Sequence, residues 1–541
     1  MPDSLDSFAK LNPISAASHG GVTVAALDMG SNSFHLVVAR GFGSSHFDVL
    51  LKEKVMMRLG DEVAATKRLS TASGERILEV VGTMAALARG VGATEMVALA
   101  TAAFRDARNA GEIVDAIEEI HGIKVSVISG RREAELIWGA VSRAVDFGGH
   151  FALSADLGGG SMEVCVGNQE NLLDAESHPI GVGRLKTGFP SLKDPSGLDL
   201  KALRAFLGSE LNERLKRLCH EFSPQIMVLS SGSFLNIARM AMIRAEGSAW
   251  WDASLNQVSI PLDTLASVTA DLQRLDSRAR AKLPGIDEKR LDLLPAAAAV
   301  LDLLIGQVQP SQVLASEWAL REGIILRELA QRSPVEFSGD ERSVKEASII
   351  GLASRYGWNE GHARQVSSLA LSVFDQTRPL HRMGAADREM LYLASLVHDI
   401  GEYISVEGHD RHGAYLLENS RLPGFDPEER NQLVSIVRYH RRGTPKGEYA
   451  PYAALSKEGA AKATKLAAIL RLADALDRSH TRLVDSIEVR IQRTQVLIFV
   501  DAHDNVELEE YGLRRKRQLF EEVFGRSVHL IQDGHELSRP S

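Results

Sequence analysis

The stretch Val22–Ala39, VTVAALDMGSNSFHLVVA, contains two β-rich apolar runs separated by an aspartate and a Gly-Ser-Asn turn. This pattern predicts a β-hairpin. Residues 151–167, FALSADLGGGSMEVCVG, repeat the order of strand, aspartate, glycine-containing turn and strand. The two aspartates, Asp28 and Asp156, are 128 positions apart (156 minus 28), which is too far for a solenoid repeat. The spacing predicts two duplicated lobes, each beginning with such a hairpin.

The turns of both hairpins predict phosphate-binding loops. Glycine lets the backbone come close to an anion, and successive N–H groups form a concave nest for phosphate oxygens. Serine hydroxyls and an asparagine amide add donors. The residues expected to contact phosphate, including a third small-residue turn after a strand, are Gly30, Ser31, Asn32, Ser33, Gly158, Gly159, Gly160, Ser161, Ser231, Gly232 and Ser233. A structural turn is the alternative for each loop alone, and for 231–233 alone it is the better explanation.

Carboxylates at the ends of these strands indicate a metal ion. Asp28 and Asp156 would repel phosphate unless a cation lay between them, so we expect Mg²⁺ (or Mn²⁺), held partly through water. Glu163, on the strand after the second loop, is a further candidate for holding the metal or positioning water. A solvent-facing strand residue is the alternative for Glu163.

The remaining periodicity predicts α/β structure first and helices later. Helices and strands alternate at 72–90, 95–100, 110–121, 124–129, 200–221 and 225–229. An all-helical region follows, with helices at 344–356, 361–376, 385–397, 412–418, 427–439 and 460–479. After residue 482, strands at 486–491, 495–500 and 527–531 and one helix at 508–524 predict a small α/β unit.

The chain of 541 residues is too long for one core. We expect a loose tail at 1–20, lobes at 21–150 and 151–335, a helical domain at 336–482 and a small α/β domain at 483–541. The two cysteines, Cys165 and Cys219, are far apart and form no CxxC pattern, which argues against a disulfide framework and fits a reducing cytoplasm. No run of about 18 apolar residues predicts a membrane span. The net charge of -9 argues against nucleic acid as a partner but allows a local basic channel.

Taken together, these motifs resemble the exopolyphosphatase / guanosine pentaphosphate phosphohydrolase family. The agreement runs in order through 28–35, 100–109, 128–137, 156–163, 231–233, 283–285 and 320–323, and it covers about 22–330 with weaker likeness to 479. The resemblance implies an actin-like (ribonuclease H-like) two-lobed α/β core with its site in the cleft between the lobes. It also implies a homodimer.

The resemblance assigns two catalytic residues. The family's general base maps onto Glu133 in the stretch ISGRREAELI (128–137), where it would deprotonate a water aimed at the terminal phosphorus. In the family, a second glutamate directly precedes this base. This chain has Arg132 at that position instead, which would put an extra cation near the phosphates. Arg105 matches the family's arginine beside the transferred phosphate. A guanidinium can donate hydrogen bonds to two phosphate oxygens at once. Without the resemblance, Glu133 is a charged residue at the start of a helix.

The helical region carries a second set of candidate metal ligands. The order His362, His398-Asp399, Asp474 resembles the HD phosphohydrolase superfamily and implies a second divalent metal. A buried structural histidine is the alternative for His398, and whether the site would add an activity stays open.

Basic residues of the same region suggest a path for a long polyanion. We expect contacts from Arg438, His440, Arg441 and Arg442, with salt-sensitive binding through release of counter-ions. A solvated basic surface is the alternative.

Three functions are compatible with these residues. The first is processive, Mg²⁺-dependent hydrolysis of terminal phosphate from inorganic polyphosphate. The second is hydrolysis of guanosine pentaphosphate to the tetraphosphate in the same cleft, and the third is a regulatory protein that binds polyphosphate or the alarmone without turnover. The large C-terminal half with its basic residues favours the polymer, and the combination of two loops with Arg105 and Glu133 argues against binding alone. Transfer to a nucleotide diphosphate would need an adenosine pocket, for which 231–233 is slender support.

Overall fold

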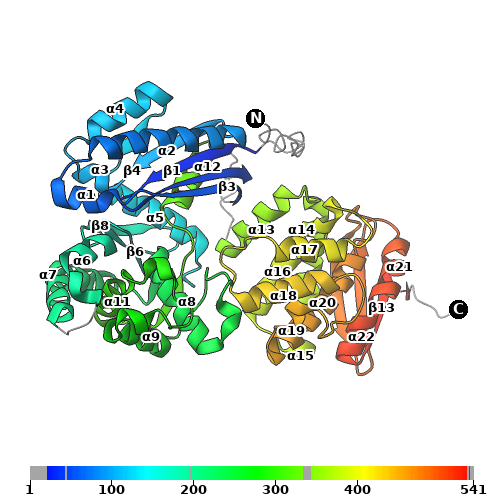
Figure 1. Ribbon diagram of the computed structural model, residues 1–541. Helices are drawn as coiled ribbons and strands as arrows, with labels where there is room; N and C mark the ends of the chain where they lie inside the picture. The colour runs from blue at the N-terminus through cyan, green and yellow to red at the C-terminus, as the bar shows by residue number, and fades with distance from the viewer. Residues whose placement is uncertain (1–20, 43–45, 194–197, 333–342, 533–534, 537–541) are drawn as a thin grey trace, which may run out of the picture.

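The computed structural model describes residues 21–42, 46–193, 198–332, 343–532 and 535–536. The tail expected at 1–20 lies outside these residues. The described chain forms two α/β lobes, one above the other, and a helical part beside them that ends in a small sheet (Figure 1). None of the described helices combines the length and apolar character that crossing a membrane requires.

Lobe I is built on a five-stranded sheet in the order β3-β2-β1-β4-β5. Its strands are β1 (Thr23–Met29), β2 (Ser33–Phe42), β3 (His46–Met56), β4 (Glu95–Ala100) and β5 (Val125–Val127). β1 and β2 pair antiparallel as the predicted hairpin, with Asp28 opposite His35, and β1 pairs parallel with β4.

Helices cover both faces of this sheet because apolar side chains alternate along β1. Ala25, Leu27 and Met29 belong to the core on one face, whereas Val24 and Ala26 belong to the core on the other. The first face packs against α1 (Leu59–Thr66), α2 (Thr71–Gly90), α3 (Ala102–Asp106) and α4 (Ala110–His121). The second packs against α5 (Gly130–Ala144) and α12 (Leu320–Arg332). α12 thus packs on lobe I, although the range predicted for the second lobe includes it.

Lobe II repeats the topology of lobe I. Its sheet has the order β10-β9-β6-β7-β8, with β6 (Ala152–Leu157), β7 (Met162–Gly167), β8 (Leu172–His178), β9 (Ile226–Ser230) and β10 (Gln312–Ala315). In each sheet the first strand is central, its hairpin partner is antiparallel and the next strand is parallel. The helices of lobe II are α6 (Val182–Gly188), α7 (Leu198–Phe222), α8 (Gly232–Glu246), α9 (Leu262–Arg274), α10 (Ser277–Arg280) and α11 (Leu294–Val308). The duplicated lobes confirm the predicted actin-like core.

The helical part and the small sheet share one hydrophobic core, which includes Leu466, Val496 and Val528. The helices are α13 (Val344–Arg355), α14 (Glu360–Gln376), α15 (Arg378–His381), α16 (Ala385–Val397), α17 (His409–Glu418), α18 (Pro427–Tyr439), α19 (Ala450–Ala453) and α20 (Lys457–Ala475). The sheet and its helices are β11 (Val484–Ile491), β12 (Gln495–Ala502), β13 (Ser527–Gln532), β14 (His535–Glu536), α21 (Glu507–Lys516) and α22 (Gln518–Phe524).

One predicted element is wrong, because the single helix expected at 508–524 is two helices that meet at Arg517. The side chain of Arg517 donates to the carbonyl of Val528 at 2.7 Å and so ties this point to β13. Helical periodicity continues across such a break, so the local pattern does not reveal it.

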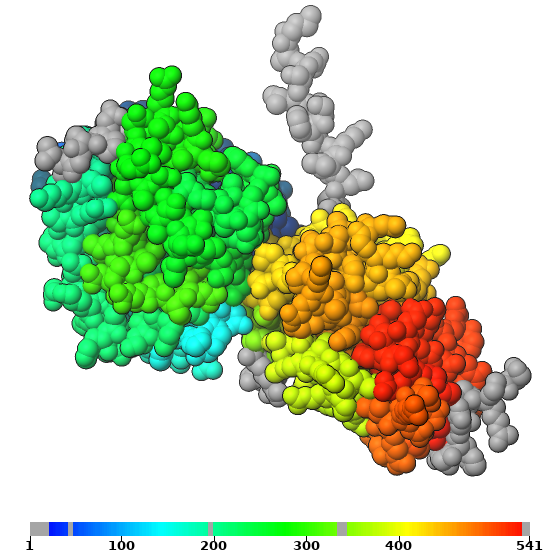
Figure 2. All heavy atoms as spheres, turned by 90° about the horizontal axis from the view of Figure 1, so that it is seen from below, coloured from blue at the N-terminus to red at the C-terminus, as the bar shows by residue number. Residues whose placement is uncertain are grey.

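The helical part meets the lobes over a limited area. Seen from below, it and lobe II are separate masses, and the small sheet lies on the far side from the lobes (Figure 2). Arg355 of α13 pairs with Asp48 of β3 at 2.6 Å, and the Gly424 N–H donates to the carbonyl of Ala144 at 3.1 Å.

The contact between α12 and α5 leaves no room for a side chain at Gly323. A Cβ there would lie 2.0 Å from the backbone oxygen of Leu136. We therefore expect Gly323→Ala to lower the free energy of unfolding by about 2–3 kcal/mol, because rigid backbone would have to move. Urea denaturation of the full chain measures this loss.

Gly306→Ala is the matched control, since a Cβ at Gly306 of α11 meets nothing within 4 Å. It should leave stability unchanged or raise it by about 0.5–1 kcal/mol. Equal effects of the two substitutions would contradict the close packing at Gly323.

Candidate active site in the interlobe cleft

The hairpin turns of the two lobes face each other across a cavity of about 410 Å³. All eleven residues predicted to contact phosphate line it, at 30–33, 158–161 and 231–233. The two loops touch: a Cβ at Gly160 would lie 2.6 Å from the Ser31 hydroxyl oxygen, so a larger residue there would have to displace the Ser31 side chain. The structure therefore brings the predicted loops together, and their binding of phosphate stays a prediction.

The third turn is held against the second loop. Ser231 has a φ of 74°, a conformation that is uncommon for residues other than glycine. Its hydroxyl donates to the carbonyl of Leu157 at 2.9 Å, which fixes the turn next to the β6–β7 hairpin. Such strained backbone is concentrated at functional sites.

Five carboxylates line this cleft: four from the predicted site, and Glu317. Asp28, Glu133, Asp156 and Glu163 all line the cavity, and burial raises the pKa of each one. The pKa of Asp28 reaches about 7, because burial and the neighbouring carboxylates outweigh the attraction of Arg321. So much negative charge beside anion-binding loops is unfavourable without a cation.

The donor chemistry of the cleft fits Mg²⁺, which prefers oxygen ligands and usually keeps several waters. Within the described residues, no three of these carboxylates converge on one point within 4.8 Å of each other. An ion here would therefore take part of its shell from water or phosphate oxygens. Hydroxyl donors orient two of the carboxylates: Ser230 donates to Asp156 at 2.6 Å, and Ser177 donates to Glu163 at 2.8 Å.

Glu133 lies in the first turn of α5, where the Ser129 hydroxyl caps the helix by accepting from the Arg132 N–H at 3.1 Å. Arg105 donates to a carboxylate oxygen of Glu133 at 2.7 Å. Burial still keeps the pKa of Glu133 above its usual value, against the effect of Arg105. A buried carboxylate with a raised pKa is a suitable proton acceptor near neutral pH.

Arg105 lies beside the candidate base, whereas Arg132 does not reach the cavity. A contact from Arg105 to phosphate stays a prediction. Arg105 lines a neighbouring hollow, together with Gly160 and Ser161, and reaches the cleft through its pairing with Glu133. Arg132 pairs with Glu135 at 2.9 Å and is not among the residues that line the phosphate cavity. The expectation of an extra cation from Arg132 near the phosphates is therefore wrong, because its position on α5 directs it away.

Sequence reasoning missed a second group of cavity residues. Arg321, at the start of α12, donates to Nδ1 of His35 at 3.1 Å, and Nε2 of His35 lies 2.8 Å from the Ser33 hydroxyl. Burial, together with Arg321 and Lys54, lowers the pKa of His35 to about 3, so the ring is neutral. Arg290 lies against Gly232 and adds a further cation. His35 and Arg321 both lie within the quoted motifs, but nothing local to them indicates that they meet.

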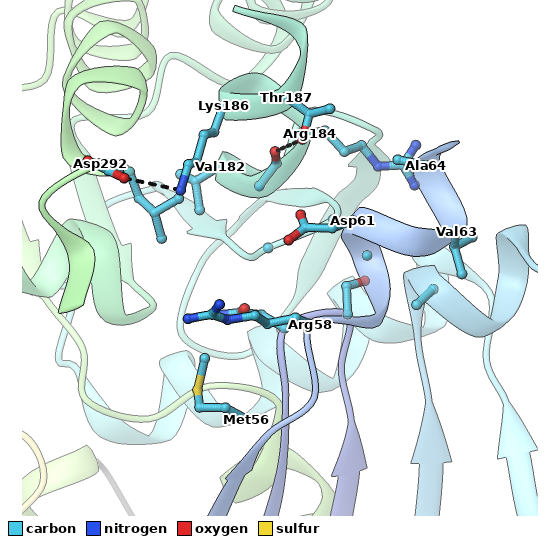
Figure 3. A pocket seen from close by; sticks show the side chains of 18 of the residues that line it. Met56, Arg58, Asp61, Val63, Ala64, Val182, Arg184, Lys186, Thr187 and Asp292 are labelled. Atoms are coloured by element: carbon cyan, nitrogen blue, oxygen red, sulfur yellow. Dashed lines mark hydrogen bonds and ion pairs between the residues drawn. The ribbon is translucent and has the colours of Figure 1, made fainter. Parts of the chain in front are cut away.

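A second pocket of about 320 Å³ continues from the first (Figure 3). The two share loop residues, including Ser31 and Gly159. Charged side chains project into the second pocket: Arg184 pairs with Asp106, and Lys186 pairs with Asp292 at 3.3 Å. The pocket extends the site away from Glu133.

The residues predicted as metal ligands in the helical part come together only in part. Nε2 of His362 and of His398 lie 3.5 and 3.3 Å from the Oδ2 atom of Asp399. Burial alone would lower the pKa of His362, but hydrogen bonds to Asp399 and Asp477 raise it to about 9. Asp474 forms an ion pair with Lys516 instead of joining this triad.

The predicted polyanion path changes as well. His440 is fully buried, and its Nε2 lies 3.4 Å from Oδ1 of Asp399, so it is not a surface contact. Arg438 pairs with the buried Asp410 at 2.8 Å, and Arg442 lies 3.8 Å from the same carboxylate. Contacts from Arg438, Arg441 and Arg442 to a polyanion stay predictions.

Known proteins resemble this chain in sequence and in fold. Exopolyphosphatase 1 of Mycobacterium leprae is 28% identical over 303 residues, which are 56% of this chain and 88% of that protein. Exopolyphosphatase 1 of Mycobacterium tuberculosis is 29% identical over 304 residues, which are 56% of this chain and 87% of that protein. The crystal structure of an exopolyphosphatase from Cytophaga hutchinsonii has 25% identity and a TM-score of 0.52, and the match covers 57% of this chain and 98% of that one.

The solved Ppx/GppA family member from Aquifex aeolicus shares the fold, with 22% identity, a TM-score of 0.50 and coverage of 58% of this chain and 99% of that one. Residues 37–332 match the model of the Ppx/GppA phosphatase family, and residues 344–517 match the model of Ppx/GppA phosphatase domain III. The two matches take in both lobes and most of the C-terminal part. This chain belongs to the Ppx/GppA phosphatase family.

Proposed function

We propose that this chain is an exopolyphosphatase that hydrolyses the terminal phosphoanhydride bond of inorganic polyphosphate in the interlobe cleft. The observation that carries the proposal is the position of Glu133, a buried carboxylate with a raised pKa, in the same cavity as the two facing loops. The curated relatives named exopolyphosphatase support the same class of substrate.

In this reaction the loops bind the terminal phosphate, and Glu133 activates the attacking water. The backbone N–H groups and hydroxyls of the loops at 30–33 and 158–161 hold the terminal phosphate, whose charge they partly offset. Glu133 accepts a proton from a water, and the water oxygen forms a bond to the terminal phosphorus as the bridging P–O bond breaks. Arg105 holds the carboxylate of Glu133 in position. Mg²⁺ (or Mn²⁺), when held by Asp28, Asp156 and Glu163, supplies positive charge to the phosphate oxygens.

The second pocket favours a substrate with several phosphates. Arg58, Arg184 and Lys186 line it beyond the loops, where the next phosphates of a chain would lie. Arg184 and Lys186 pair with Asp106 and Asp292, so the phosphates of a polymer would have to replace these carboxylates as partners of the two cations. The same pocket also has apolar walls from Met56 and Val182. The nucleoside of guanosine pentaphosphate could occupy the pocket against these walls. Guanosine pentaphosphate is therefore the second candidate substrate.

Phosphate release by the full chain from long-chain polyphosphate and from guanosine pentaphosphate, at equal Mg²⁺, tests the proposal. We expect kcat/KM to be at least about 10-fold higher for the polymer, which is a difference of about 1.4 kcal/mol in transition-state stabilisation. A preference for the pentaphosphate would replace the proposal by the second candidate. Tight binding of either compound without phosphate release would instead indicate a regulatory binding protein.

A further inference from the structure

A histidine on strand β2 connects the first phosphate loop to helix α12. Nδ1 of His35 lies 3.1 Å from Nη1 of Arg321, and Nε2 of the same ring lies 2.8 Å from the hydroxyl oxygen of Ser33. Ser33 and His35 are 2 positions apart on the strand, so their side chains leave the same face of the sheet. All three residues line the interlobe cavity. The proposed reaction uses the loop that contains Ser33 but gives no role to His35.

The contact with Arg321 decides which nitrogen of His35 carries the proton. A guanidinium has N–H donors and no acceptor, so Nδ1 can take part in this contact only through a lone pair. A ring with a lone pair on Nδ1 is neutral and carries its single proton on Nε2. If the ring were turned over about its Cβ–Cγ bond, both contacts would fall on carbon atoms and both hydrogen bonds would be lost. The two neighbours therefore determine both the orientation and the tautomer of the ring.

The charges around His35 favour the same neutral state. Asp28 is the opposite residue on β1, yet within the described part of the chain the ring nitrogens bond only to Arg321 and Ser33. The cations that act on the ring are Arg321, Lys54, Arg290 and Lys52. A proton on Nδ1 would point at the guanidinium and add a further positive charge to this group, which is unfavourable.

The tautomer of His35 fixes the role of the Ser33 hydroxyl. The hydroxyl oxygen accepts the Nε2–H of His35, so the hydroxyl proton has to point elsewhere. Among the described residues the hydroxyl has no second partner, and the side chain lines the cavity. The proton of Ser33 is therefore available to a group bound in the loop. The oxygens of an ionised phosphate accept such a hydrogen bond.

The other tautomer would be unfavourable for anion binding. With the proton on Nδ1, the lone pair of Nε2 would accept the hydroxyl proton of Ser33. The hydroxyl would then turn only lone pairs toward the cavity, and lone pairs repel an anion. Arg321 thus has two effects: it places a cation in the cavity, and through His35 it sets the direction of the Ser33 proton.

We propose that His35 is a positioning residue for phosphate binding: Arg321 locks its ring in the neutral form protonated on Nε2, and the ring holds the Ser33 hydroxyl as a donor to a phosphate oxygen. The inference rests on the proposed function in taking phosphate as the bound group. It also gives the loop a preference, because a ligand atom that can only accept is favoured at Ser33 over one that can only donate.

Nuclear magnetic resonance of the full chain with nitrogen-15-labelled histidine tests the tautomer without any measurement of activity. The chain has 17 histidines, so the signals of His35 are identified as those that disappear in His35→Gln. Long-range nitrogen–proton correlations at neutral pH distinguish a protonated ring nitrogen from a bare one. We expect a protonated Nε2 and a bare Nδ1 in wild type. In Arg321→Met, which removes the donor, the Nδ1 signal should shift toward the position of a protonated nitrogen.

A double-mutant cycle tests whether His35 acts through Ser33. Dissociation constants for long-chain polyphosphate with Mg²⁺ are measured in the Glu133→Gln background, so that the polymer is not consumed. Ser33→Ala should weaken binding by about 10-fold, the effect of losing one hydrogen bond to a charged group. His35→Asn keeps an acceptor for Arg321 but is too short to reach Ser33, and it should weaken binding by about 3–5-fold, because the hydroxyl loses its orientation. In the Ser33→Ala background the same change should have less than about a 2-fold effect, since both substitutions act on one hydroxyl.

Two further variants serve as matched controls. His35→Gln has an amide that can still donate to Ser33, so it should bind within about 2-fold of the background protein. His121→Gln removes another histidine of lobe I, whose Nε2 lies 2.9 Å from the carbonyl of Leu78 and which does not line the cavity. It should leave the dissociation constant unchanged.

A protonated Nδ1 in wild type would overturn the assigned tautomer, and a bare Nδ1 that persists in Arg321→Met would overturn the lock. An equal effect of His35→Asn with and without the Ser33 hydroxyl would overturn the action through Ser33. Circular dichroism shows whether each variant is folded. If one variant of His35 does not fold, the wild-type spectrum, assigned with the other variant, decides the matter. Because the spectrum requires no turnover, absence of phosphate release from polyphosphate would count against the proposed function and not against this tautomer.

Discussion

Replacing Glu133 by glutamine is expected to lower kcat for phosphate release from polyphosphate by about 10³-fold. The amide keeps the size of the side chain but cannot accept the proton of the attacking water. KM should change little, because the loops that hold the terminal phosphate are untouched. Initial rates at saturating polymer and Mg²⁺, with binding measured separately, give the two quantities.

Glu135→Gln is the matched control for this experiment. Glu135 lies on the same helix but pairs with Arg131 and Arg132, and it does not line the cavity. Its replacement should leave kcat within about 2-fold of wild type, as for surface changes remote from a site. If Glu133→Gln kept more than a tenth of the wild-type rate, Glu133 would not be the base, and another group would have to activate the water.

Replacing Asp156 by asparagine is expected to lower kcat/KM by at least about 10²-fold and to raise the Mg²⁺ concentration needed for half-maximal activity. The change removes one of the charges that would hold the ion between the two loops. Phosphate release measured as a function of Mg²⁺ tests this. Asp174→Asn is the control, because Asp174 is on strand β8 of the same sheet and pairs with Arg217. It should need the same Mg²⁺ concentration for half-maximal activity as wild type. An unchanged Mg²⁺ requirement in Asp156→Asn would contradict a metal role for this carboxylate.

Although Asp156→Asn should lower activity, it should leave the stability of the folded protein unchanged or raise it. Burial raises the pKa of Asp156 above its ordinary value of 3.8. The folded state therefore binds this proton more tightly than the unfolded state, and it loses stability as the pH rises above that value. Asparagine carries no charge and avoids this loss. In the presence of a chelator at neutral pH, Asp156→Asn should melt at the same temperature as wild type or higher, and a lower melting temperature would argue for a structural role.

Much of the fold is determined by local patterns. The two hairpins follow from alternating apolar residues on either side of small-residue turns, and their 128-residue separation by itself indicates duplication. Helices α4, α16 and α18 have the bounds that their periodicity predicts. The break at Arg517 was missed, because a contact from Arg517 to β13 accompanies it and periodicity does not show it.

For the candidate site too, some features follow from local sequence and others only from tertiary packing. By itself, the sequence determined which residue types follow each strand, and hence the small-residue loops and carboxylates of the cleft, because turn chemistry is local. Tertiary structure alone decided that Arg105 pairs with Glu133, that Arg321 reaches His35 and that His440 faces inward to Asp399. These partners are 28, 286 and 41 positions apart in the chain (133 minus 105, 321 minus 35, 440 minus 399). Which side chains meet over such separations depends on how whole helices and sheets pack, and no local preference encodes that packing.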